Sequence, residues 1–305
     1  MHPKRILAVD IGGSKLLTAL ASVAAGGHVS FSGRVRRELD RRFGKAEILD
    51  AAFRACDETL RAADGGFDAV GITIPGLADP ETGTWLYAPF SGIRDFPVAE
   101  EFRRRYAKPV AAENDVNACA WAEHIFGACR EIDDFLWITV SNGVGGGLVL
   151  GGKIFRGAFG SAAEVGHFKV AENGAPCGCG GRGCLEAEAA GPAISRRYAE
   201  MTGRAGVSAL EIAGAARQGE AAAIEVYRQT GNLLGKAAAL AANLLNPAAI
   251  VFGGGVSESF DLFRESLENR FRSDIMSFAN KEVRLLKTQL GYEAGLFAAA
   301  SLLYR

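Results

Sequence analysis

The sequence has no surplus of charge of either sign. Its 305 residues include 34 Lys and Arg against 35 Asp and Glu, which leaves a formal net charge of −1. A chain without a positive surplus produces no overall field that attracts nucleic acid or an anionic membrane surface. We therefore expect a small-molecule partner and expect neither nucleic acid nor a membrane to be bound.

The sequence also lacks a long uninterrupted apolar run. Its richest apolar stretch, residues 233–252, contains Lys236 and Pro247, which a membrane span of about 20 residues would not absorb. The apolar run at residues 6–9 is ended by Asp10 and two glycines, so it does not resemble a signal peptide. Cysteines number only six, and three of them lie together, which is typical of a cytosolic metal site rather than a disulfide framework. We expect a cytoplasmic protein.

Glycine, in contrast, is abundant. The chain has 39 glycines, nearly twice the usual share of about 7%. The strand-forming residues 4–10 lead into Gly12-Gly13 and a second run from Lys15, and residues 135–140 lead into the glycine-rich segment 141–147 in the same way. Rossmann and Walker loops enter a helix directly, so they match poorly. The repetition indicates an internal duplication, unless two common glycine hairpins coincide.

Hydrophobic periodicity predicts a mixed α/β chain. Helices are expected at residues 47–63, 100–106, 115–126, 189–201, 208–218, 221–245 and 293–303. Strands are expected at residues 28–36, 69–74, 110–112, 153–155 and 250–252, and irregular loops at 78–97 and 157–191. The small residues Gly231 and Gly235 are interpreted as a stripe for close helix packing.

The sharpest chemical pattern is one histidine followed by three cysteines. His167 precedes Cys177, Cys179 and Cys184 in a CxCGxxGC segment. Three thiolates and one imidazole complete a tetrahedral zinc site without an open position, which is the structural type. Free cysteines and a zinc ribbon on nucleic acid are the alternatives, but the neighbouring residues are acidic rather than basic.

A second pattern places a carboxylate at the start of a helix. Glu113-Asn114-Asp115 follows a strand and opens the helix expected at residues 115–126. Asp115 is then either a helix cap or a catalytic base. The base is favoured if the glycine turns bind phosphates, because phosphoryl transfer needs one carboxylate to deprotonate the acceptor hydroxyl.

Six segments together resemble the ROK family of sugar kinases and sugar-responsive repressors, in its zinc-containing, glucokinase-like form. They occur in the family's order and cover nearly the whole chain. The segments are DIGGSK (10–15), ENDVNACA (113–120), NGVGGG (142–147), EVGH (164–167), CGCGGRGCLE (177–186) and LNPAAIVFGGGV (245–256).

The resemblance implies the two-domain fold of actin, hexokinase and Hsp70, with duplicated ribonuclease H-like βββαβαβα units and a cleft for ATP and sugar. Residues 1–116 would form the small N-terminal domain, to which a helix at 292–305 returns. Residues 117–291 would form the large domain with the zinc-binding loop. The family's frequent dimers imply a homodimer.

The resemblance also implies roles for individual residues. Asp115 is similar to the family's catalytic base, Asp10 to the residue that orients Mg²⁺ and its waters, and the four zinc ligands to a structural site. Sugar binding would involve Gly76, Asn114, Asp115, Glu164, His167 and Glu186. ATP binding would involve Asp10, Gly12, Gly13, Ser14, Lys15, Asn142, Gly143, Gly253 and Gly254.

The sequence departs from the family pattern in three places. Ser141-Asn142 stand where the family usually has Gly-Thr, which removes a threonine hydroxyl near the phosphates, offers the Asn142 amide instead and bears on nucleotide affinity. Ala163 replaces a frequent glycine and Glu188 replaces a common aromatic residue, and neither removes a group that phosphoryl transfer needs.

The implied activity is that of an ATP-dependent hexokinase, which transfers the γ-phosphoryl group to a hydroxyl, the 6-OH, of a free hexose. Glucose is the leading substrate; N-acetylmannosamine, N-acetylglucosamine and fructose are alternatives. A sugar-sensing regulator without enzymatic activity is an alternative of another class. Family repressors carry an N-terminal helix-turn-helix, for which a first strand at Lys4 leaves no room.

Overall fold

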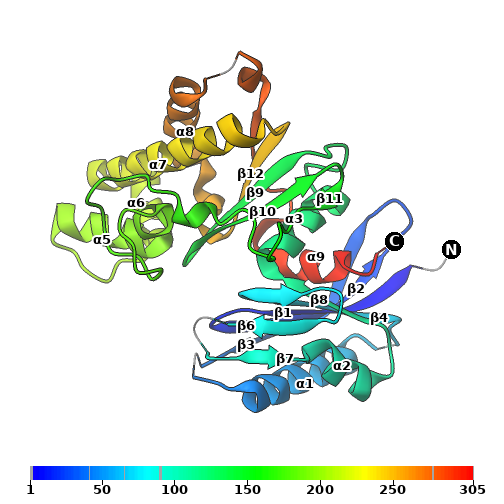
Figure 1. The fold of residues 1–305 in the computed structure, drawn as a ribbon. Helices are drawn as coiled ribbons and strands as arrows, with labels where there is room; N and C mark the ends of the chain where they lie inside the picture. Colours follow the sequence, from blue (N-terminus) through cyan, green and yellow to red (C-terminus); the bar gives the residue numbers. More distant parts are fainter. Residues whose placement is uncertain (1–2, 41, 65, 89–90, 277, 305) are drawn as a thin grey trace. The chain divides into compact units, whose positions relative to one another are not determined.

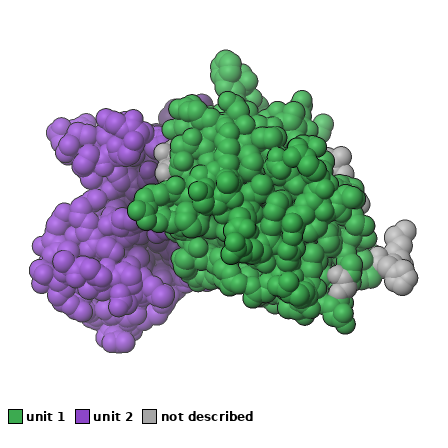
Figure 2. All heavy atoms as spheres, turned by 90° about the horizontal axis from the view of Figure 1, so that it is seen from below, with its two compact units in different colours: residues 1–131, 153–161, 293–305 green, residues 132–152, 162–292 purple. Residues whose placement is uncertain are grey.

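The computed structural model describes residues 3–40, 42–64, 66–88, 91–276 and 278–304 (Figure 1). The chain divides into two compact units (Figure 2). Unit 1 comprises residues 1–131, 153–161 and 293–305, and unit 2 comprises residues 132–152 and 162–292. Compactness alone does not test the domain boundary expected at residue 116, which stays a prediction.

Unit 1 is built on a mixed sheet in the order β3-β2-β1-β4-β8. β1 pairs antiparallel with β2 and parallel with β4, and β4 pairs parallel with β8. Three further strands form a small antiparallel sheet, β5-β6-β7. The strands are β1 (Lys4–Ile11), β2 (Lys15–Val23), β3 (Val29–Glu38), β4 (Ala69–Ile74), β5 (Leu77–Asp79), β6 (Thr84–Tyr87), β7 (Arg94–Phe96) and β8 (Val110–Asn114).

Both faces of this sheet are covered by helices. Successive side chains of β1 alternate between the faces: Leu7 and Val9 pack in the core that α1 and α2 share, whereas Ala8 packs with α9. α9 also packs against α3 (Figure 1). The helices are α1 (Lys45–Ala62), α2 (Val98–Tyr106), α3 (Asp115–Phe126) and α9 (Ala294–Ser301).

Unit 2 contains a second sheet with the same relative order, β11-β10-β9-β12-β13. β9 pairs antiparallel with β10 and parallel with β12, and β12 pairs parallel with β13. The strands are β9 (Phe135–Val140), β10 (Val144–Leu150), β11 (Lys153–Ile154), β12 (Ala249–Gly253) and β13 (Arg284–Lys287). Two sheets of one topology are what the repeated strand and glycine pattern predicts.

The helices of unit 2 bury one large apolar core with this sheet. They are α4 (Leu185–Ala189), α5 (Gly191–Thr202), α6 (Ala209–Arg217), α7 (Ala221–Leu245) and α8 (Phe260–Asp274). A side chain at Gly231 or Gly235 would collide with the backbone of α8, so the small-residue stripe serves packing, as interpreted.

Two expectations about loops were wrong. Residues 78–97 contain parts of the β5-β6-β7 sheet, which forms because Trp85 is fully buried and donates a hydrogen bond from Nε1 to the carbonyl of Pro75 at 2.8 Å. Residues 157–191 contain a 3-10 turn at Val165–His167 and the short helix α4. The sequence analysis also missed β13, whose exposed and half-buried residues give little periodic signal.

Among the described residues, no helix combines the length and the apolar character needed to cross a membrane.

Candidate functional site

Three parallel strands of unit 1 end at one edge of the sheet, and the polar residues expected there lie at their carboxyl ends. Asp10 pairs in register with Thr73 of β4, which pairs with Glu113 of β8. Gly76 follows β4, and its carbonyl accepts a hydrogen bond from Nδ2 of Asn114 at 2.8 Å. The sheet therefore brings Asp10, Gly76 and Asn114, which come from three separate segments of the sequence, to the same edge of unit 1.

Asp10 is enclosed on two sides. Its Oδ1 accepts a hydrogen bond from the Thr73 hydroxyl at 2.8 Å, and a side chain at Gly295 of α9 would collide with its carboxylate. Burial raises the pKa of Asp10, although Thr73 and Lys15 oppose the rise. A cation would stabilise the charged form of such a carboxylate, so this position fits a residue that faces Mg²⁺.

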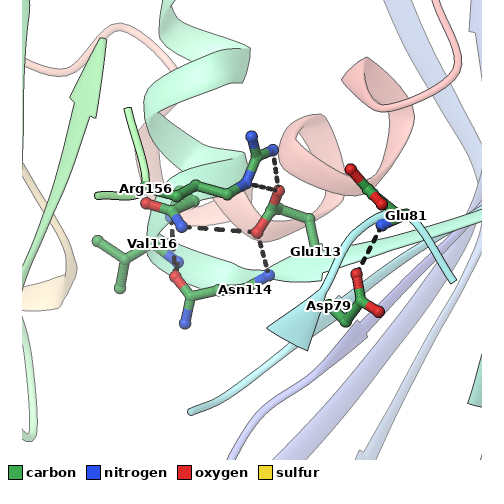
Figure 3. Close-up of polar contacts among 7 residues, drawn as sticks. Asp79, Glu81, Glu113, Asn114, Val116 and Arg156 are labelled. Carbon is green, nitrogen blue, oxygen red and sulfur yellow. Dashed lines mark hydrogen bonds and ion pairs between the residues drawn. The ribbon is translucent and has the colours of Figure 1, made fainter. Parts of the chain in front are cut away.

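The turn from β8 into α3 orients Asp115, and its neighbours Asn114 and Val116 are drawn in Figure 3. Asn114 is the N-cap, because its Oδ1 accepts hydrogen bonds from the backbone N–H groups of Val116 and Asn117. Asp115 is the first helical residue, and its Oδ1 accepts from Val116 N at 3.0 Å and from Asn114 Nδ2 at 3.1 Å. Its Oδ2 has no hydrogen bond to any described residue, so one oxygen is available to accept a proton.

The pKa of Asp115 is shifted toward neutrality. Burial raises it to about 7, and the nearby Asp10 carboxylate adds to the rise. A base with a pKa near the working pH transfers protons efficiently. Both the free Oδ2 and the shifted pKa are properties that a general base needs.

The glycine turn of unit 1 joins β1 to β2. It closes with a hydrogen bond from Gly12 N to the Lys15 carbonyl at 2.8 Å, and Gly13 and Ser14 lie within it. A Cβ at Gly12 would lie 3.1 Å from the same carbonyl. The turn is therefore narrow, and its residues Gly12–Lys15 are half-buried; a role in phosphate binding stays a prediction.

Unit 2 has a matching edge where β9 and β12 end side by side. Ser141, Asn142 and Gly143 follow β9, and Gly253-Gly254 end β12. Part of this glycine content serves the protein itself: a Cβ at Gly253 would collide with Trp137, and Gly254 has a φ of 85° and lies against Val140. Glycine here is needed for packing whether or not a nucleotide binds.

The four expected metal ligands converge. The ligand atoms of His167, Cys177, Cys179 and Cys184 lie within 4.8 Å of one another. Cys179 Sγ and Cys184 Sγ are 3.6 Å apart, and Cys177 Sγ is 3.7 Å from His167 Nδ1. A tetrahedral site with Zn–S bonds of about 2.3 Å requires S–S separations of about 3.8 Å. The donor set therefore fits Zn²⁺.

Charge and backbone support the cluster. Lys169 Nζ lies 2.9 Å from Cys184 Sγ, where its ammonium would partly balance the charge of the thiolates if a metal were bound. Backbone hydrogen bonds link Cys177 N to Gly181 O and Leu185 N to Phe168 O. Residues 157–191 contain little regular secondary structure, so contacts among the four candidate ligand side chains and backbone hydrogen bonds hold their conformation.

The expected sugar carboxylates lie beside the cluster. Glu164 Oε2 is 4.0 Å from His167 Nε2, the ring nitrogen that does not face Cys177, and the Glu164 side chain is 61% exposed. Glu186 Oε1 is 3.9 Å from Cys177 Sγ, and its Oε2 accepts from Val144 N at 3.1 Å. A Cβ at Gly143 would lie 2.5 Å from that oxygen. Glu186 thus contacts the expected nucleotide turn as well as the cluster.

The structure explains two of the departures from the family pattern. Ala163 has a φ of 67°, a left-handed conformation that glycine adopts without strain. Glu188 is buried, where its Oε1 accepts from Ala175 N at 2.5 Å and its Oε2 pairs with Arg197. Glu188 therefore ties the cysteine loop to α5.

Sequence reasoning missed three residues around these sites. Thr73 and Arg156 act on Asp10 and Glu113, and Lys169 lies beside the cysteines. Thr73 could have been found, because it lies near the end of a buried strand that precedes Pro75-Gly76. Arg156 and Lys169 carry no local signal, since their partners are distant in the sequence or depend on the fold of the loop.

Comparison with known proteins identifies relatives along the whole chain. The sequence profile of the ROK family matches residues 6–305. A glucokinase of Streptomyces coelicolor is 32% identical over 97% of this chain and 96% of its own length. The regulator NagC of Escherichia coli is 30% identical over 84% of this chain but only 63% of its own. The crystal structure of a ROK family glucokinase from Streptomyces griseus with glucose and AMPPNP has a TM-score of 0.84 and 34% identity, and 98% of each chain is covered.

Proposed function

Because this chain belongs to the ROK family and has its actin/hexokinase-like fold, we propose that it is an ATP-dependent hexokinase that phosphorylates glucose at the 6-OH. The observation that carries the proposal is the Asn114–Asp115 turn, which presents a carboxylate with a pKa of about 7 whose Oδ2 has no hydrogen-bond partner among the described residues. Glucokinases related along nearly the full chain support glucose as the substrate.

In the proposed reaction, Asp115 accepts the proton of the attacking hydroxyl as that oxygen bonds to the γ-phosphorus and the bond to the ADP oxygen breaks. Asn114, Gly76, Glu164, His167 and Glu186 would hold the sugar hydroxyls. The turn at Gly12–Lys15 and the segments at Asn142-Gly143 and Gly253-Gly254 would approach ATP. Asp10 would hold Mg²⁺, which neutralises charge on the transferred phosphoryl group.

The His167–Cys177–Cys179–Cys184 cluster is proposed to bind structural Zn²⁺. Zinc would hold His167 through Nδ1 and leave Nε2 for a sugar hydroxyl. It would also fix Glu164 and Glu186 through a few residues of backbone, so the metal acts on sugar binding without taking part in the transfer. Thiolate ligands need a reducing compartment, which supports a cytoplasmic protein, and we propose a homodimer by analogy with the family.

The test is to incubate the purified protein with Mg-ATP and a panel of glucose, fructose, N-acetylglucosamine and N-acetylmannosamine, and to measure ADP release. We expect the highest kcat/KM with glucose and a turnover that is ~10²–10⁴-fold lower in Asp115→Asn. Higher kcat/KM with another sugar would change the substrate. Sugar binding without any turnover would contradict the proposed enzyme and favour the sugar-sensing regulator.

A further inference from the structure

An ion pair joins the buried Glu113 to the partly exposed Arg156 beside Asn114 (Figure 3). Glu113, the residue before Asn114, is only 2% exposed. Its Oε2 accepts a hydrogen bond from Arg156 Nε at 3.0 Å and a second from the same guanidinium group. Two donors from one arginine fix a carboxylate in orientation as well as in position.

The other oxygen of Glu113 acts on the turn itself. Oε1 accepts from the backbone N–H of Asn114 at 2.9 Å and lies 3.5 Å from Asn117 Nδ2. Asn114 in turn caps α3 and donates to Asp115 Oδ1. A continuous series of hydrogen bonds therefore runs from Arg156 through Glu113 and Asn114 to Asp115.

Arg156 comes from a distant segment that is fixed in unit 1. It follows β11, within residues 153–161. Gly160 of the same segment lies close to Leu77, because a Cβ there would be 3.2 Å from Leu77 Cδ1. The segment that carries Arg156 is therefore anchored in unit 1. The Arg156 side chain is 33% exposed, so its role is not only to fill the core.

We propose that Arg156 is a positioning residue for phosphoryl transfer, which holds Glu113 so that the Asn114–Asp115 turn presents Oδ2 to the substrate hydroxyl. This inference rests on the proposed function of Asp115. Glu113 without its cation would be a buried, unpaired carboxylate, and it would move toward solvent. That movement releases Asn114 N and shifts the base. A displacement of about 1 Å is enough to slow such a reaction about 100-fold.

The first test is steady-state kinetics of Arg156→Gln. We expect kcat to fall about 10- to 100-fold, while KM for sugar and for ATP stays within about threefold. Among the described residues, the Arg156 side chain hydrogen-bonds to Glu113 and not to those proposed to bind sugar or ATP, and Glu164 and His167 belong to the separate cysteine segment. Arg105→Gln is the matched control, since it removes an exposed ion pair with Asp57 in the same unit, and its kcat should be unchanged. A raised KM with normal kcat would make Arg156 a substrate ligand and overturn the proposal.

A double-mutant cycle tests whether the effect passes through Glu113. Glu113→Gln and Arg156→Gln should each lower kcat, and the double variant should lose no more than the worse single variant, because both changes break the same interaction. Losses that multiply in the double variant would show independent roles and contradict the proposal.

Arg156→Lys keeps the inference testable if the glutamine variant fails to fold. Lysine retains the charge but not the paired donors, so we expect a folded protein with kcat between those of Arg156→Gln and the wild type. A lysine variant with full kcat, beside a glutamine variant that does not fold, would reduce the ion pair to a folding role. Asp115→Asn distinguishes a failure of the proposed function from a failure of this inference. If Asp115→Asn keeps turnover, Asp115 is not the general base. If Asp115→Asn loses turnover but the Arg156 variants keep it, Arg156 is not a positioning residue.

Discussion

The two regions that carry the expected sugar contacts are held in different ways. The Asn114–Asp115 turn of unit 1 lies between a strand and a helix. Asn114 donates hydrogen bonds to the Gly76 carbonyl and the Glu113 carboxylate, and it accepts hydrogen bonds from the first turn of α3. The segment from Glu164 to Glu186 in unit 2 has little regular structure and four candidate metal ligands. The first region is held by hydrogen bonds, including those that Arg156 and Glu113 make behind it, whereas the second would depend on the proposed zinc ion. Substitutions in the first region should therefore lower kcat, and substitutions in the second should weaken sugar binding.

The largest expected effect is on the hydrogen-bonded region. Asp115→Asn keeps the shape of the side chain but removes the proton acceptor, so kcat should fall by ~10²–10⁴-fold. Sugar affinity, measured by calorimetry, should stay close to that of the wild type. A variant that keeps more than about a tenth of wild-type kcat would contradict a base at this position.

The metal-dependent region should lose binding instead. Cys179→Ser removes one of four ligands, so bound zinc per chain should fall and sugar affinity should drop by at least ~10-fold, the scale on which metal-site contacts act. ATP affinity should be largely kept, because Gly12 and Gly253 lie in other segments.

The control for this variant is Cys129→Ser, which changes a buried cysteine outside the cluster. Metal analysis comes first, followed by separate titrations with sugar and ATP. Equal loss of both affinities would mean that the metal supports only global folding. Unchanged sugar affinity after metal loss would remove the loop from the sugar site.

The dependence of kcat/KM on pH tests the first region without a mutation. Asp115 must be ionised to act as a base, and its pKa in the free protein is about 7 because of burial and Asp10. The rate constant should therefore rise about tenfold per pH unit below pH 7 and level off above it. A flat profile between pH 6 and 8 would contradict this assignment.

The same carboxyl group should affect stability with a defined sign. Its pKa is raised on folding, from 3.8 to about 7, so its stabilising contribution is full below about pH 4 and is lost as the pH rises through 7. Asp115→Asn should remove this loss and raise Tm at pH 8 by about 2 °C or more relative to the wild type. The difference should disappear near pH 4, and a lower Tm at pH 8 would argue against a strained charge.

The smallest effect is expected beside the metal ligands. Ala163 is left-handed, with a φ of 67°, and Ala163→Gly should relieve this strain, although the freer unfolded chain offsets part of the gain. We expect stabilisation of about 0.5 kcal/mol and a rise in Tm of about 1 °C. Thermal unfolding of the zinc-loaded protein measures it, and a lower Tm would show that the loop holds Ala163 without strain.

The sequence predicted the elements and sites that have local signals, and it missed those that depend on contacts between distant residues. The strand at 69–74 and the helices at 115–126 and 221–245 were predicted to the residue, because their periodicity and end signals are local. The metal cluster was found because cysteine spacing is itself a local signal. The β5-β6-β7 sheet was missed, since it depends on the burial of Trp85 against Pro75. The Arg156–Glu113 pair was missed because 43 residues separate its members.

The sequence analysis distinguished glycines needed for ligand binding from glycines needed for packing only in part. Gly231 and Gly235 were correctly assigned to helix packing. Gly253 and Gly254 were assigned to ATP, and the structure shows that both also accommodate neighbouring parts of β9 and its end. A glycine that serves a ligand and one that serves a neighbouring chain segment look the same in sequence, because both need only the absence of Cβ.

The contact between α9 and the first sheet has a consequence for biosynthesis. Gly71 of β4 lies directly under the backbone of Ala299, and Gly295 lies against Asp10. β1 and β4 leave the ribosome early, but the helix that covers them follows only after the whole of unit 2 has been made. An apolar sheet face thus remains uncovered during most of translation, which is the state in which nascent chains are prone to aggregate or to need a chaperone. The surroundings of Asp10 are completed only when that late helix docks.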